Sequence, residues 1–377
     1  MLVWLCVPMS VVCLCLFKVG ELWRSRPRSP ADLIYDDGDL PRHPGPSSGA
    51  VRARRDGDLM DVALVSEQTL QRGRDVKRRF AAWLMQGGVS IPLDTLITES
   101  VLIIPLIHSY GRAQYTEGRS LSDYRQLLAA LQRDNLSLRG RMPEAWDLVS
   151  RWQSVEPTCH RTPLPRAICL AMIAVALQRG HRRWAACLMI AFEGICRIGE
   201  VLRPSCRRHN LILPSESWGE SPHAYLRVDQ PKTGMRGGAT VQHARITDAP
   251  SIMLLESIFS GVTADERLYP WSVVHFRDTW DTILASLLVP PEIALTPGGV
   301  RGGGAVAAYH RQVPIADILW QMRLRSQEAL AHYLQEVAAL NVTLGLSEEC
   351  RASITAARNC LTLFLANMTP RGSRPPT

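Results

Sequence analysis

The sequence lacks the short motifs by which many enzymes hold a metal ion or a nucleotide. Its 10 cysteines include no C-x-x-C pair, and the chain has neither a G-x-G-x-x-G loop nor a Walker phosphate-binding loop. A zinc centre, a dinucleotide cofactor and a nucleoside triphosphatase site therefore have no support. Most cysteines lie in apolar runs such as AICLAMIAVAL, where a thiol behaves as a small hydrophobe. This usage favours a reducing compartment over a disulfide framework.

Acidic residues are too few to balance the basic ones. The chain of 377 residues has 43 Lys and Arg against 35 Asp and Glu, a formal net charge of +8. Such a balance favours a polyanionic partner, nucleic acid among them. The length allows two compact domains with tails, and 46% hydrophobic residues suffice for their cores.

The first 65 residues divide into two unlike segments. Residues 1–17 are almost wholly apolar, and three readings remain open for them: a signal peptide or anchor, an upstream segment wrongly joined to the gene, and a buried hydrophobic arm. Residues 18–65 are mostly Pro, Gly, Ser, Arg and Asp, so we expect a disordered linker that buries little apolar surface.

Residues 66–140 have the pattern of a small helical domain. Val76, Phe80 and Leu84 recur at helical spacing, and SLSDYRQLLAALQR reads as a second amphipathic helix. Asp94 is expected to cap a further helix, which Pro105 would kink or end. Basic residues crowd the first of these helices and are candidate DNA contacts: Arg72, Arg74, Lys77, Arg78 and Arg79.

Residues 157–345 predict a second, mixed domain. Helices are expected over Arg166–Gln178, Arg182–Phe192 and several later segments, the last of them Gln327–Leu340. Two strand-like runs, HAYLRVDQ and ATVQHARI, flank a turn rich in Gly and Pro. The fold class is therefore α+β and helix-dominant, with a small antiparallel sheet. Residues 346–377 are expected to form a C-terminal helix and tail.

Four segments supply the residue types that cleavage of a phosphodiester requires: a guanidinium clamp, a proton donor and a nucleophile. They are EGICRIGEVLRPS around Arg197, QPKTGMRGG around Lys232, LTPGGVRGGGAVAAY around Arg301 and MRLRSQEALAHYLQEVAAL around Tyr333. In this order and spacing they resemble the tyrosine recombinases of the phage-integrase superfamily. The run R-x-R-S-x-x-x-L-x-x-Y-L-Q-E particularly resembles the recombinase of DIRS-like mobile elements. The resemblance spans roughly residues 66–345, with 66–140 as a SAM-like core-binding domain.

The resemblance implies a role for each residue of the site. Arg197 and Arg301 would bind the phosphate, and Glu200 would support Arg197 from behind. Lys232 would protonate the leaving 5′-oxygen, and Tyr333 would be the nucleophile. The small residues Gly302–Gly304 would let the backbone approach DNA closely.

Two positions depart from the family pattern. Gly298 stands where the family has a histidine, and Leu324 stands where it has a histidine or tryptophan. Trp320, one turn before Leu324, is a candidate to supply an indole N–H instead. His310 and His332 fit less well, because on continuous helices neither shares a face with the arginine or tyrosine it would serve.

The resemblance implies a DNA recombinase that forms a 3′-phosphotyrosine intermediate and needs no cofactor or metal. Its partner would be double-stranded DNA, and family members act as tetramers, which implies self-association on DNA. The alternative is a DNA-binding relic of a mobile element with weakened or lost strand transfer. The two lost histidine-type positions favour the relic, and the retained arginines, lysine and tyrosine favour the enzyme. The expected location is the nucleus or cytoplasm; a membrane or secretory reading rests on residues 1–17 alone.

Overall fold

The computed structural model describes residues 65–157, 161–218, 220–229, 231 and 241–368. The apolar segment 1–17, all but the last residue of the predicted linker, Lys232 and the end of the C-terminal tail lie outside these residues. Within them, helices dominate beside a three-stranded antiparallel sheet, which confirms the predicted helix-dominant α+β class. No helix in this described part is both long and apolar enough to cross a membrane.

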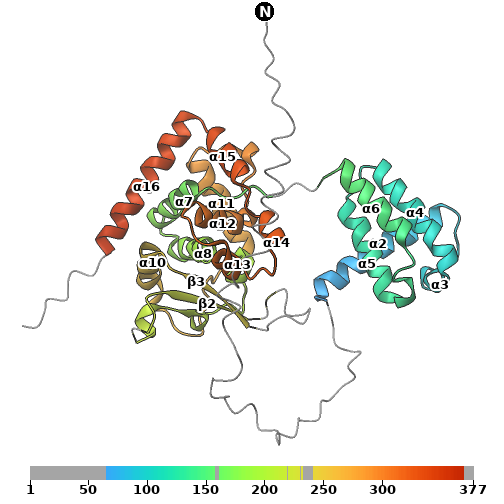
Figure 1. Ribbon diagram of the computed structural model, residues 1–377, viewed down its shortest axis with the longest axis horizontal. Helices are drawn as coiled ribbons and strands as arrows, with labels where there is room; N and C mark the ends of the chain where they lie inside the picture. Colours follow the sequence, from blue (N-terminus) through green and yellow to red (C-terminus); the bar gives the residue numbers. More distant parts are fainter. Residues whose placement is uncertain (1–64, 158–160, 219, 230, 232–240, 369–377) are drawn as a thin grey trace, which may run out of the picture. The chain divides into compact units, whose positions relative to one another are not determined.

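The helices of residues 66–156 enclose a hydrophobic core of their own (Figure 1). Val76, Phe80 and Leu84 are buried along the first helix, at the spacing that the sequence indicates. The last helix adds Trp152 to the same core, so the bundle continues beyond residue 140. Its α-helices are α2 (Glu67–Gln86), α3 (Leu93–Thr98), α4 (Ser100–Thr116), α5 (Leu121–Asp134) and α6 (Pro143–Val155).

The start of the second helical segment differs from the prediction. Pro92, not Asp94, is the N-cap of α3, and Asp94 lies in the first turn. The chain then breaks at Glu99, and α4 continues through Pro105 instead of ending there. Pro105 lies near the start of α4, where the ring removes a single hydrogen bond, to the carbonyl of Val101. The break at Glu99 therefore takes the place of the expected stop at the proline.

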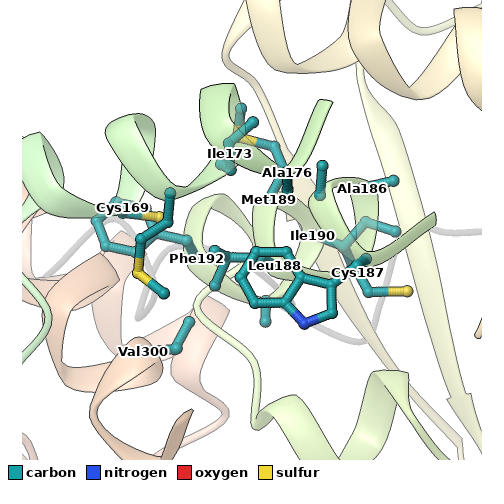
Figure 2. Close-up of a cluster of buried hydrophobic side chains, with 14 of the residues drawn as sticks. Cys169, Ile173, Ala176, Ala186, Cys187, Leu188, Met189, Ile190, Phe192 and Val300 are labelled. Carbon is teal, nitrogen blue, oxygen red and sulfur yellow. The ribbon is translucent and has the colours of Figure 1, made fainter. Parts of the chain in front are cut away.

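The C-terminal domain is built around α7 and α8, which lie side by side in its core. Both are buried along most of their length, and Val300 at the start of α12 reaches the same cluster (Figure 2). The bounds of α7 equal the predicted ones. Its α-helices are α7 (Arg166–Gln178), α8 (Arg182–Glu193), α9 (Ile198–Val201), α10 (Ala249–Phe259), α11 (Val273–Ser286), α12 (Val300–His310), α13 (Ile315–Met322), α14 (Gln327–Ala331), α15 (Glu336–Leu344) and α16 (Glu348–Met368).

The small sheet lies at the edge of this domain, in the order β1-β2-β3. The strands β1 (Leu211–Ile212), β2 (Ala224–Asp229) and β3 (Val241–Ile246) are all antiparallel to their neighbours. Leu226 and Ala244 face each other in the register and are fully buried. The long helix α16 runs along α7 (Figure 1), burying Cys350 and Ile354 in the main core.

The packing of α4 on α5 makes Gly111 a sensitive position. A methyl group there would lie 2.5 Å from Cζ of Tyr124 and 2.7 Å from Cδ2 of Leu148. We expect Gly111→Ala to lower the free energy of unfolding by about 1–3 kcal/mol, because the core must move to admit the group. Urea denaturation measures the loss. Ser109→Ala, exposed on the same helix, is the control. An unchanged midpoint for Gly111→Ala would contradict this close packing.

Candidate functional site

A pocket of about 720 Å³ in the C-terminal domain brings together residues that are far apart in the sequence. Among its lining are five of the positions that the sequence singled out: Arg197, Gly298, Arg301, Leu324 and Tyr333. A further arginine, Arg161, lines it as well. Of the described residues around the pocket none is Asp or Glu. Such a lining favours an anionic ligand over a cation.

Arg301 is the most deeply buried charge of this pocket. It lies in the first turn of α12 and is 3% exposed. Its Nη2 donates to the carbonyl of Met322, whereas Nε and Nη1 have no acceptor among the described residues. Burial, followed by repulsion from Arg197, lowers the pKa of Arg301 to about 10. The guanidinium is thus still charged at neutral pH, and two of its nitrogen atoms are buried without an acceptor among the described residues.

Arg197 is held at the pocket by Glu200. The chain turns sharply after α8, with Ile195 at a φ of 46°, and Arg197 becomes the N-cap of α9. One oxygen of Glu200 accepts from Nη1 of Arg197 at 3.0 Å, and the other accepts from the Arg197 backbone N–H at 3.0 Å. Glu200 lies outside the pocket lining, behind the arginine.

A second arginine, Arg323, also contacts Glu200. Its Nη2 donates to Oε2 of that carboxylate at 2.5 Å. Arg323 ends α13 in the left-handed conformation, at a φ of 57°, which costs an L-residue about 1–2 kcal/mol. Burial raises the pKa of Glu200, but Arg323 and Arg197 together outweigh it and lower the pKa below its usual value. The motif pattern does not assign this contact to Arg323.

Tyr333 does not lie in a helix, contrary to the expectation of one helix over Gln327–Leu340. The helix α14 ends at Ala331, α15 begins at Glu336, and Tyr333 lies in the turn between them. Cζ of Arg301 stands 5.2 Å from the centroid of the Tyr333 ring. The expectation that His332 and Tyr333 point to different faces assumed one continuous helix, and the helix stops at Ala331. His332 also lines the pocket.

The glycines of α12 mostly face protein and not the pocket. A methyl group at Gly303 would overlap the backbone carbonyl of Leu164, and one at Gly304 would overlap that of Phe192. Gly302 alone of the three lines the pocket. The expectation that Gly302–Gly304 together bring the backbone close to DNA is therefore wrong for two of the three residues.

Trp320 lies elsewhere. Its side chain is 53% exposed, and Cζ of Arg245 on β3 stands 5.2 Å from its ring centroid. It is not among the residues that line the pocket. Lys232 lies outside the described residues, so its predicted place beside the arginines stays a prediction. His310 contacts Glu336 at 3.2 Å and is likewise not part of the lining.

The basic face of α2 is largely neutralised by acidic neighbours. Arg72 is its one predicted DNA contact for which the described residues supply no ion pair. The four others are paired: Arg74 with Glu67 at 2.5 Å, Lys77 with Asp134, Arg78 with Asp75 at 3.6 Å and Arg79 with Asp123 at 2.8 Å. Any duplex binding through this helix must compete with these exposed or half-exposed pairs.

The pocket offers anion binding beside a phenol and no evident metal ligation. Among the described residues, no three His, Cys, Asp or Glu side chains are grouped so that they could hold a metal ion. Chemically, the arrangement can bind an oxyanion on guanidinium groups and present the Tyr333 hydroxyl to it. Neither protein-family models nor the curated proteins give a match to this chain.

The Glu200 cluster predicts a defined pH dependence of stability. Since the pKa of Glu200 is lowered on folding, its carboxylate stabilises the fold above about pH 4.5 and less as pH falls through the folded value. We expect Glu200→Gln to lower the free energy of unfolding by about 3–5 kcal/mol at pH 7. The difference from wild type should narrow in acid. Denaturant titrations at several pH values measure it, and a constant difference would contradict the ion-pair role.

Proposed function

We propose that this protein binds double-stranded DNA and breaks and rejoins its strands through Tyr333. The observation that supports this most is the pairing of Arg301 with Tyr333 in a pocket lined by arginines. A buried guanidinium, two of whose nitrogens have no acceptor among the described residues, lies 5.2 Å from the Tyr333 ring. The helix break before Tyr333 turns that side chain toward the same space. This geometry suits attack by a phenol oxygen on a bound phosphate.

In the proposed reaction, Oη of Tyr333 attacks the phosphorus and the P–O5′ bond breaks. The phenol releases its proton to solvent, and a 3′-phosphotyrosine forms with a free 5′-hydroxyl. Arg197 and Arg301 stabilise the charge on the phosphate oxygens. Lys232 is the proposed donor of the proton to the leaving oxygen. Attack by a 5′-hydroxyl reverses the step, so the phosphoester energy is retained and no nucleotide is consumed.

The competing function is a DNA-binding relic with little strand transfer. Gly298 and Leu324 both line the pocket, and neither side chain can donate a hydrogen bond or a proton. General acid–base groups contribute about 10²–10⁴-fold each, so their loss slows the reaction without abolishing phosphate binding. Tyr333 separates the two proposals, because a relic has no need of it.

Both proposals share the remaining assignments. The partner is duplex DNA, bound by both the N-terminal bundle and the C-terminal domain, with self-association of the protein on DNA. The proposed compartment is the nucleus or cytoplasm, where DNA is accessible. The proposed reaction uses side chains of the protein, with no cofactor and no metal ion.

Covalent capture tests the enzymatic proposal directly. The protein is incubated with nicked duplexes of randomised sequence, and adducts that survive denaturation in detergent are isolated and sequenced. We expect adducts from wild type and none from Tyr333→Phe, which lacks the nucleophile. Tyr309→Phe, exposed on α12 and absent from the pocket lining, is the matched control and should leave the yield unchanged. Adducts that persist in Tyr333→Phe would overturn the assignment.

The salt dependence of DNA affinity tests the contribution of α2. Counterion release makes affinity fall steeply as salt rises, with a slope that reflects the number of phosphate contacts. We expect Arg72→Glu and Arg78→Glu each to reduce that slope by about one phosphate contact. The described residues give Arg72 no ion pair, and Arg78 has only a long one. Arg79→Glu should do less, because Arg79 is already paired with Asp123. Equal slopes for all variants would place duplex binding elsewhere.

A further inference from the structure

The space that a side chain at position 298 would fill is already taken by Arg161. A methyl group added to Gly298 would overlap Nη1 of Arg161 and lie 2.7 Å from its Cδ and 2.8 Å from its Cζ. Arg161 thus lies directly over the backbone of Gly298, at the wall of the pocket. The glycine leaves a vacancy, and a guanidinium from a distant part of the chain occupies it.

The segment that carries Arg161 is fixed on the start of α12 by close backbone contacts. The N–H of Leu164 donates to the carbonyl of Gly299 at 3.1 Å. A methyl group at Gly299 would overlap the carbonyl oxygen of Thr162, and one at Gly303 that of Leu164. The glycines therefore allow this segment to lie against the same helix that carries Arg301.

We propose that Arg161 is a third phosphate-binding residue, which replaces the charge of the missing histidine beside Arg197 and Arg301. This inference rests on the proposed function and adds a residue to its site. Arg161 is exposed, and the described residues give it no acidic partner, so its charge is available to a ligand. Arg161 lines the pocket, and none of the described residues around the pocket is a carboxylate that would neutralise its guanidinium.

Arginine replaces only part of what a histidine does. Its planar fork can donate two hydrogen bonds to phosphate oxygens, more than an imidazole can. It stays protonated near neutral pH, however, and cannot pass a proton to a leaving group. The proposed substitution thus preserves phosphate binding and leaves proton transfer to another residue. It predicts a site that binds the phosphate firmly and reacts slowly.

The experiment measures anion binding by thermal stabilisation of the full chain with sulfate, at constant ionic strength. A ligand that binds only the folded state raises the melting temperature according to its concentration and Kd. We expect Arg161→Ala to weaken sulfate binding about 10-fold, the loss of one charge-assisted contact. Arg161→Lys should retain part of it, because the charge remains while the fork is lost. Arg301→Met gives the baseline of general salt effects.

Gly298→Ala provides a second test that leaves Arg161 in the sequence. The added methyl must push the guanidinium aside, so it should weaken sulfate binding in wild type and have no further effect in Arg161→Ala. Such non-additivity marks two residues that act through one contact. Gly261→Ala is the matched control, since Gly261 is exposed outside the pocket lining and a methyl group there meets nothing within 4 Å. Arg179→Ala, exposed at the end of α7, controls for net charge.

The outcomes separate this inference from the proposed function. Loss of sulfate binding in Arg161→Ala and Gly298→Ala, with Gly261→Ala and Arg179→Ala like wild type, supports it. Wild-type sulfate binding by Arg161→Ala, with binding lost in Arg301→Met, overturns the role of Arg161 and leaves the pocket intact. Identical responses of all variants, Arg301→Met included, would overturn both the role of Arg161 and the phosphate site of the proposed function.

Discussion

The buried and incompletely neutralised charge of Arg301 is the constraint on which the rest of the site depends. A buried ion is costly unless it is paired, and among the described residues a single backbone carbonyl accepts from the guanidinium. The nearby carboxylate of Glu200 is already shared by Arg197 and Arg323. The left-handed end of α13 at Arg323 follows directly after Met322, the residue that supplies the carbonyl. Among the described residues this cation has no ion-pair partner, which suits the phosphate site proposed above.

Local sequence patterns predict most of the fold, and tertiary packing explains where they fail. The apolar spacing of α2 is predicted by helical periodicity, because this helix buries one face. The bounds of α7 are predicted by its continuous apolar run, because this helix is buried over nearly its whole surface. The segment after Ser326 also has a helical pattern, yet the chain leaves the helix at Ala331. There Leu330, Leu334 and the ring of Tyr333 join the small cluster formed by α12 and α13. That packing outweighs the helical preference of the segment, and no local signal reveals it.

The pocket itself was predictable only in part. The spacing of motifs indicated Arg197, Arg301 and Tyr333, because a shared chemistry constrains their types and order. Arg161 could not be found in this way, since it meets Gly298 through folding and belongs to no motif. The glycine was nevertheless an indirect signal: where a side chain is expected and absent, another group can fill the space. A continuous helix would keep His332 away from the face of Tyr333, but the helix ends at Ala331 and His332 lines the pocket.

The distribution of charge bears on the choice between an enzyme and a DNA-binding relic. A protein that only holds duplex DNA gains affinity from many exposed cations along the backbone, each of which releases counterions. The predicted cations of α2 are instead mostly paired with acids of the same bundle. In the pocket, Arg197 shares Glu200 with Arg323, whereas the described residues give Arg161 and Arg301 no ion pair. These arginines surround a volume that suits a small anionic group more than a length of duplex. Concentrating charge on one phosphate, beside a phenol, benefits chemistry at that phosphate more than it benefits binding along a duplex, and this favours the enzymatic proposal.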